Sequence, residues 1–253
     1  MSRTNCFLIS DWHIGMIVRP EATYKLNQYN LRIAEKRVEK LSQKINAFNA
    51  QHQTKSSVVF LLGDFVNAHK DDEIPPNEQT HHAQKLLAHV LNNISNLTEI
   101  YCALGNHKSK TDTVGDETIY NVLHECVGDK RIYFLPQGEG IAKIEGKSIY
   151  YMHGADYEKT FGGSLAADIQ SVAYTVNRTR NFAASMGKHI DYFFMGHYHQ
   201  FIRYRDIVVN NSLCGMPEYA IKSKYPFSLP SQTAVTIDSR YGIVTVEELH
   251  LAD

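Results

Sequence analysis

The chain has 253 residues, of which 43% are hydrophobic and 21% are charged, and its formal net charge is −1 at pH 7. This length fits one large domain or two small ones, with a core that needs no disulfide. A net charge near zero argues against a protein that coats nucleic acid through its overall charge, although a local basic patch would still allow nucleic acid as a substrate. No apolar stretch approaches the roughly 18 residues of a membrane span or forms a signal peptide, so we expect a cytoplasmic protein that does not bind membranes.

Strands and helices alternate along most of the chain, which predicts an α/β fold with helical crossovers between parallel strands. The longest predicted helix, residues 29–52, has apolar residues spaced four and three apart on one face. Beyond residue 197 short strands follow one another with little helix between them, and we interpret them as a second sheet that closes a single domain over residues 1–253. The other predicted helices cover residues 78–96, 116–127 and 165–186, and the late strands cover residues 201–204, 207–209, 234–237 and 243–249.

Five apolar runs, each typical of a buried strand, end in residues that commonly bind metal ions. Open α/β sheets bind ligands at the carboxyl edge of their strands, so the side chains at these five ends are expected to meet. In the two Asp/His-x-His doublets, residues two apart on extended backbone would share a face and point at one site. Gly63, Gly105 and Gly196 precede three of the ends and permit tight exits from the strands. The five ends carry Asp11 and His13; Asp64; Asn106 and His107; His153; and His197 and His199.

The order of these five motifs resembles that of the calcineurin-like metallophosphoesterases over roughly residues 6–215. The resemblance implies a four-layer α/β/β/α sandwich with a mixed central pair of sheets. It also implies two divalent metal ions that clamp a phosphoryl group and activate a water between them, with Asp64 as the bridging ligand. By this resemblance the first metal is held by Asp11, His13 and His199, and the second by Asn106, His153 and His197.

The resemblance also implies a catalytic set made of His107 together with Asn106 and Asp64. The family uses this histidine to stabilise the phosphorane or to protonate the leaving oxygen, and an imidazole suits either role at neutral pH. The other histidines have no such context and are predicted not to be ligands. They are His52, His69, His81, His82, His89, His124, His189 and His250.

The predicted donors are nitrogen and oxygen atoms with no thiolate. This mixture suits Mn, Fe, Zn, Co or Ni better than Mg or Ca alone. We expect two divalent ions and favour Mn, because nucleases of the family are commonly described with it. The four cysteines are expected to be reduced thiols with a structural role; they are Cys6, Cys102, Cys126 and Cys214.

Departures from the family pattern separate its branches. Protein phosphatases follow the Gly-Asp motif with Val-Asp-Arg-Gly-type residues and the Asn-His pair with an acidic residue. Here Asp64 is followed by Phe-Val-Asn and His107 is followed by Lys108, so the arginine that grips the phosphate is missing. A protein phosphatase is therefore disfavoured. A binding module with an inactive site is also disfavoured, since no predicted ligand is missing.

Three segments, residues 10–15, 29–38 and 208–220, resemble phage-encoded metallophosphoesterases described as DNA repair exonuclease-like. This resemblance implies a phosphodiesterase that acts as a nuclease on DNA, in the host cytoplasm if a phage encodes it. The alternative is a phosphatase or phosphodiesterase for a small or cyclic nucleotide. Fold alone does not decide between these substrates.

Candidate substrate contacts follow two of the motifs. Lys108 and Lys110 come after the Asn-His pair, and Tyr157 and Phe161 come after His153. Aromatic and basic side chains together suit single-stranded nucleic acid, but they suit a nucleotide equally well, and solvated surface charge is the plainer interpretation. The expected partner is therefore a nucleic acid or nucleotide substrate, and a homo-oligomer is left open.

Overall fold

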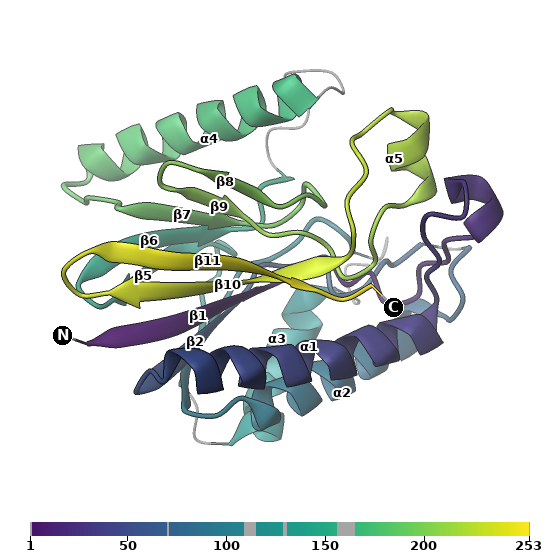
Figure 1. The fold of residues 1–253 in the computed structure, drawn as a ribbon, viewed down its shortest axis with the longest axis horizontal. Helices are drawn as coiled ribbons and strands as arrows, with labels where there is room; N and C mark the ends of the chain where they lie inside the picture. Colours follow the sequence, from purple (N-terminus) through teal and green to yellow (C-terminus); the bar gives the residue numbers. More distant parts are fainter. Residues whose placement is uncertain (1, 70, 109–114, 129–130, 156–164, 253) are drawn as a thin grey trace.

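The computed structural model describes residues 2–69, 71–108, 115–128, 131–155 and 165–252. Two β-sheets pack face to face, with helices over the outer face of each sheet (Figure 1). This arrangement confirms the predicted four-layer α/β/β/α sandwich. None of the helices within these residue ranges is long and apolar enough to cross a bilayer.

The first sheet is built from β1 (Arg3–Ile9), β2 (Ser56–Leu61), β3 (Leu97–Cys102), β4 (Arg131–Phe134), β10 (Ser231–Asp238) and β11 (Gly242–His250). Its order is β11-β10-β1-β2-β3-β4, with β1 to β4 parallel, β10 antiparallel to β1, and β11 antiparallel to β10. Successive side chains of a strand point to opposite faces. Cys6 and Leu8 therefore pack between the two sheets, while Phe7 and Ile9 pack under the helices.

The second sheet is built from β5 (Gly140–Ile144), β6 (Lys147–Met152), β7 (Tyr192–Met195), β8 (Ile202–Tyr204) and β9 (Ile207–Val209). Its order is β5-β6-β7-β9-β8, with β6, β7 and β9 parallel and the two edge strands antiparallel to their neighbours. Phe60 of the first sheet packs edge-on against Phe194 of the second, 5.1 Å between ring centroids. The aromatic core between the sheets fixes one set of strand ends relative to the other.

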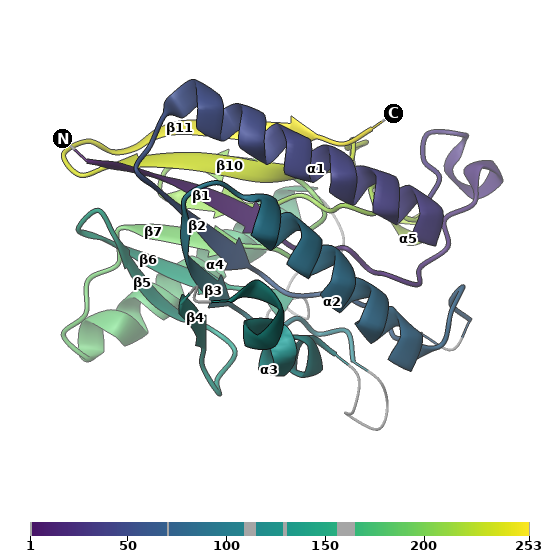
Figure 2. The same ribbon diagram turned by 90° about the horizontal axis from the view of Figure 1, so that it is seen from below.

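The outer face of the first sheet is covered by α1 (Leu31–His52), α2 (Pro76–Asn93) and α3 (Asp116–Val127), as Figure 2 shows from below. The second sheet is covered by α4 (Leu165–Ser185). Helix α1 begins where the Asn30 side chain accepts a hydrogen bond from the Ile33 N–H, which satisfies one of the unpaired donors at its first turn. The predicted apolar stripe of α1 is buried, and the four predicted helices agree with the structure within three residues at each end. Two short helices, η1 (Pro20–Thr23) and α5 (Glu218–Lys222), complete the set in the described residues.

The late strands divide between the two sheets, so the prediction that they all form a second sheet is wrong. Only β8 and β9 join the second sheet, whereas β10 pairs with β1 and carries β11 at the edge of the first. All eight residues of β10 are buried, because both of its faces and both of its edges are covered. Alternation of apolar residues predicts a strand but does not specify its partner. Strands β4 and β5 lie outside the predicted elements.

Candidate metal centre

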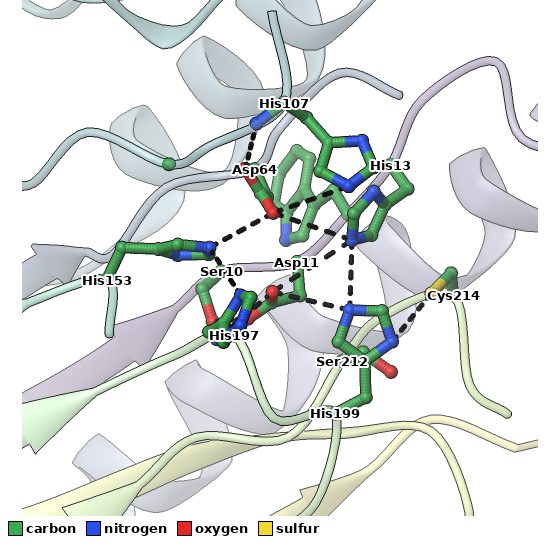
Figure 3. Close-up of polar contacts among 12 residues, drawn as sticks. Ser10, Asp11, His13, Asp64, His107, His153, His197, His199, Ser212 and Cys214 are labelled. Carbon is green, nitrogen blue, oxygen red and sulfur yellow. Dashed lines mark hydrogen bonds and ion pairs between the residues drawn. The ribbon is translucent and has the colours of Figure 1, made fainter. Parts of the chain in front are cut away.

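The segments that follow β1, β2, β3, β6 and β7 meet at one end of the two sheets. There the structure brings together the imidazoles and carboxylates that the sequence places at the strand ends (Figure 3). The carboxylates of Asp11 and Asp64 are both almost fully buried. Buried charge of this kind needs a counter-charge or a metal.

One group of donors surrounds His153. Its Nε2 atom lies 3.0 Å from Asp64 Oδ2 and 3.0 Å from Asn106 Oδ1. His197 Nδ1 lies 3.2 Å from the same His153 nitrogen. His153 Nδ1 is 2.6 Å from the Leu62 carbonyl and donates to it, so Nε2 is the ring nitrogen that faces the other donors. These are the four residues predicted for the second metal together with its bridge.

The other group of donors surrounds His13. Its Nε2 atom lies 3.0 Å from His199 Nε2 and 3.9 Å from Asp11 Oδ1. His199 Nε2 is 3.4 Å from the same Asp11 oxygen. Asp64 Oδ2 is 4.0 Å from His13 Nε2 as well as 3.0 Å from His153 Nε2, so one carboxylate oxygen lies between the two groups. This is the position a bridging ligand would occupy.

The backbone at these residues is not extended. Asp11, His13, Asp64, His197 and His199 all have φ between +47° and +74°, in the left-handed region. The prediction that extended backbone aims both members of each doublet is therefore wrong, because the doublets reach the site through left-handed residues that redirect the chain. A non-glycine residue in this region costs on the order of 1–3 kcal/mol, and such residues cluster at functional sites.

Two glycines allow the close approach of the loops. Gly63 has a φ of +91°, which an L side chain rarely adopts. At Gly105 an added Cβ would lie 2.0 Å from Asp64 Oδ1. Any side chain at Gly105 would thus displace the carboxylate that lies between the two donor groups.

Asp116, at the start of α3, holds two of the loops and was not predicted from the sequence. Its Oδ2 atom accepts hydrogen bonds from the Asp64 and Gly105 N–H groups, each at 2.8 Å, and Oδ1 accepts one from the Phe65 N–H at 3.0 Å. Burial and the nearby Asp64 charge raise the pKa of Asp116 to about 6. The sequence signal for this residue was only an acidic side chain in the first turn of a helix.

Cys214 is the second residue that sequence reasoning missed. Its Sγ atom lies 3.9 Å from His199 Nδ1 and 3.4 Å from the Gly215 carbonyl oxygen. With the thiol donating to that carbonyl, the sulfur accepts from the His199 Nδ1–H, and His199 Nε2 faces Asp11 and His13. The outer nitrogen of a metal-binding histidine is commonly oriented by such a contact.

Asp64 and His13 have the protonation states that a metal ion needs, whereas His153 does not. Burial disfavours the Asp64 carboxylate, but His153, His13 and His107 outweigh it and hold the pKa of Asp64 well below its usual range. Burial and the neighbouring His107 and His199 hold the pKa of His13 well below its usual range, so its imidazole is neutral. Burial also disfavours the His153 imidazolium, but the Asp64 charge raises the pKa of His153 to about 9. A metal ion would have to displace that proton.

His107 lies at the mouth of the site, with 24% of its side chain exposed. Its backbone N–H donates to Asp64 Oδ1 at 2.9 Å, and its ring Nδ1 donates to the Asn67 carbonyl at 2.9 Å. Nε2 is therefore the ring nitrogen that faces the buried donors, 3.9 Å from Asp64 Oδ2. The ring also lies 4.5 Å from that of His13, near enough for His107, His13 and Asp64 to form a third donor cluster.

The predicted substrate contacts are only partly within the described residues. Lys108 is exposed on the loop that carries His107, while Lys110, Tyr157 and Phe161 lie outside the described residues. A cleft of about 200 Å³ opens beside Asn106 and His153, and Gln137 and Glu139 line its far side. The eight histidines predicted not to be ligands belong to none of the donor clusters in the described part of the chain.

Comparison with known proteins agrees with this geometry. The family profile of calcineurin-like phosphoesterases matches residues 5–201, which is most of the chain. The chain belongs to this family. No curated protein sequence matches the chain.

Solved structures with a similar fold are distant relatives in sequence. Vps29 from Entamoeba histolytica, complexed with zinc, is 11% identical with a TM-score of 0.43, over 98% of this chain and 99% of its own. Protein TM1076 from Thermotoga maritima is 13% identical with a TM-score of 0.39, over 99% and 100%. A dimetal phosphatase from Danio rerio is 8% identical with a TM-score of 0.48, over 98% and 99%. The family assignment rests on the sequence match.

Membership in this family implies a metal-dependent phosphoester hydrolase, and the donor set fits two metal ions. Four imidazole nitrogens and two carboxylates converge in a buried space, and within the described residues neither Asp11 nor Asp64 forms an ion pair with a lysine or arginine. His13 Nε2 and His199 Nε2 face each other at 3.0 Å, close enough for both to bind one cation. Nitrogen and carboxylate donors of this kind favour borderline divalent ions.

Proposed function

We propose that this calcineurin-like phosphoesterase is a binuclear phosphodiesterase that cleaves nucleic acid, with DNA as its first candidate substrate and Mn as its first candidate metal. The observation that carries the proposal is the position of Asp64 Oδ2 between the His13 and His153 donor groups. In the proposed site Asp64 binds both ions. Asp11, His13 and His199 hold one, and Asn106, His153 and His197 hold the other.

The ions would polarise the phosphoryl group and supply a nucleophilic water at neutral pH. The protein contributes position and protons. The Ser10 Oγ–H donates to Asp11 Oδ2 at 2.5 Å, and the His197 N–H is shared between Oδ2 and Oδ1 at 3.1 and 3.2 Å. Asp11 Oδ1 also faces His13 and His199. Asp116 fixes the Asp64 loop against the Asn106 loop. The site is therefore held in place before substrate arrives, which is the usual source of catalytic precision.

His107 is the proposed general acid. Because Nδ1–H is held by the Asn67 carbonyl, the proton delivered to the leaving oxygen would come from Nε2, which faces the buried donors. After that transfer the neutral imidazole is regenerated as an acid by solvent, to which the ring is partly exposed. A positioned general acid typically contributes 10²–10⁴-fold to the rate.

Lys108 favours a diester within a polymer over a monoester. Its backbone follows His107 directly, and the residue is exposed, so its charge lies beside the site where a flanking phosphate would pass. Each lysine–phosphate contact makes affinity fall with salt. The test measures Mn-dependent cleavage of labelled single-stranded and double-stranded DNA and of RNA between low and moderate salt, with the variant Lys108→Ala. Lys55→Ala, an exposed lysine just before β2 at the opposite end of the sheet, is the matched control.

We expect DNA cleavage that weakens with salt and a smaller salt slope in Lys108→Ala than in Lys55→Ala. Hydrolysis of cyclic nucleotides is measured in parallel, because the cleft of about 200 Å³ beside His153 favours a small nucleotide as the second candidate substrate. A protein that leaves DNA and RNA intact while it hydrolyses a small nucleotide efficiently refutes the nuclease proposal and supports this alternative.

A further inference from the structure

A second depression lies on the opposite side of the metal centre from the cleft at His153. His199, a proposed metal ligand, forms part of its wall. The depression is shallow, with a volume of about 10 Å³, and three of its ten lining residues are tyrosines. Among the described residues that line it there is no carboxylate. Its main lining residues are Tyr198, Gln200, Tyr219, Tyr225 and Pro226.

The depression is formed largely by α5 and the segments on either side of it. Hydrogen bonds from Asn27 and Arg37 fix the segment that precedes α5. Asn27 Nδ2 donates to the Cys214 and Met216 carbonyls, each at 2.9 Å. The Arg37 guanidinium donates to the Leu213 and Cys214 carbonyls at 2.8 and 2.9 Å. The segment that leads into α5 is therefore fixed to α1 and to the loop after η1, so the aromatic wall has a rigid base.

The surface around the depression is unusually apolar for exposed side chains. Tyr219 is 50% exposed, Phe227 49% and Leu229 43%. Tyr24 and Leu26, which follow η1, are also exposed, and η1 contacts α5. Figure 1 shows η1, in purple, beside α5 at the end of the molecule to which β1 leads. An exposed apolar surface next to an active site commonly binds a ligand.

Tyr219 lies one ring away from the proposed metal ligands. The Tyr219 ring lies 6.3 Å from the His199 ring, and the other side of His199 is 3.0 Å from His13 Nε2. A phosphate held at the His13–His199 side would thus place the group attached to it over Tyr219. The attached group that suits an aromatic, uncharged wall is a planar ring.

We propose that the unpaired nucleobase next to the scissile phosphate stacks on the exposed ring of Tyr219, at the rim of this shallow depression. The proposal rests on the proposed function, since it takes a nucleotide phosphate at the metal centre as its starting point. Stacking on an aromatic side chain tolerates any base, because each base has a π-face. A base in a duplex is already stacked on its neighbours, so the subsite selects single-stranded ends over paired DNA.

The test measures binding to the Mn-loaded protein by titration calorimetry, with two probes that differ only in the base. Thymidine 5′-monophosphate carries it, and 2-deoxyribose 5-phosphate lacks it. Tyr219→Ala removes the ring and Tyr219→Phe retains it. Tyr241→Ala is the matched control, because Tyr241 is 61% exposed in the β10–β11 turn at the opposite end of the molecule (Figure 1).

In the wild type and in Tyr241→Ala, we expect the nucleotide to bind about tenfold more tightly than the sugar phosphate, the usual size of one base–aromatic stack. Tyr219→Ala should bring the two dissociation constants together, and Tyr219→Phe should keep them apart. Equal affinities in the wild type, or a preference that survives in Tyr219→Ala, overturn the proposal. Failure of the proposed function is distinct, because it shows as absence of phosphodiester hydrolysis by the wild type, which the calorimetric readout does not require.

Discussion

Replacing Asp116 by asparagine tests whether this buried carboxylate positions the metal centre. In the structure one oxygen of Asp116 accepts two N–H groups and the other accepts one. An asparagine side chain has a single carbonyl oxygen. In its better orientation it keeps the bonds from Asp64 and Gly105 and leaves the Phe65 N–H facing an NH₂ group.

A buried donor without an acceptor costs about 1–3 kcal/mol. Part of this cost is offset, because burial and repulsion from Asp64 already disfavour the ionised form of Asp116 and raise its pKa to about 6. We therefore expect Asp116→Asn to lower the free energy of unfolding by an amount toward the lower end of that range. For a chain of this length each kcal/mol lowers the Tm by about 2–4 °C.

The functional effect should exceed the effect on stability. The lost bond releases the loop that carries Asp64, and loss of an outer contact of this kind typically lowers metal affinity 10–100-fold. The assays are thermal unfolding in chelator, Mn titration by calorimetry, and kcat on bis-p-nitrophenyl phosphate. Glu117→Gln, at an exposed position in the same helical turn, is the control. Metal affinity and kcat in Asp116→Asn that match those of Glu117→Gln would refute the positioning role.

Three further predictions concern the donors themselves. His107→Gln should keep both metals, measured by plasma emission, and lose about 10²–10⁴-fold in kcat; loss of a metal ion would instead make His107 a ligand. Cys214→Ala should weaken metal binding at the His199 side about tenfold in a calorimetric titration. Cys214→Ser keeps a donor and an acceptor and should restore most of that affinity. Unchanged affinity in Cys214→Ala would show that the sulfur does not orient His199. The metal-free His153 has a pKa of about 9, so its proton must leave when metal binds. The affinity for Mn, measured from pH 6 to 8, should therefore rise about tenfold per pH unit. A metal affinity that does not change with pH would contradict this.

The sequence predicted those parts of the fold that depend on local pattern. The stripe of α1 is an example, since apolar residues three and four apart define a helix face whatever it packs against. The strand ends also identified the donors that the structure brings together, because the carboxyl edge of a sheet is a property of the chain direction alone. The partner of a strand within a sheet, in contrast, does not follow from local pattern. Strand β10 lies beside β1, more than two hundred residues away, and nothing in its own residues specifies that neighbour.

The backbone conformation of the two ligand doublets differs from the extended one that the sequence predicted. Asp11 and His13 reach the site from left-handed conformations, as do His197 and His199. Local preference opposes this conformation for non-glycine residues, so it exists only because the surrounding loops enforce it. Asp116 escaped prediction for a related reason, since its hydrogen bond to the Asp64 N–H spans 52 positions in the chain and leaves no local pattern.

In the proposed site, Asp64 is a ligand of two metal ions at once. Metal content, measured by plasma emission after equilibration with Mn and removal of free ions, tests it in the wild type and in Asp64→Asn. We expect two equivalents per chain in the wild type, with both sites weakened together in the variant and activity lost on every substrate. Two tightly bound equivalents and normal turnover in Asp64→Asn would contradict it.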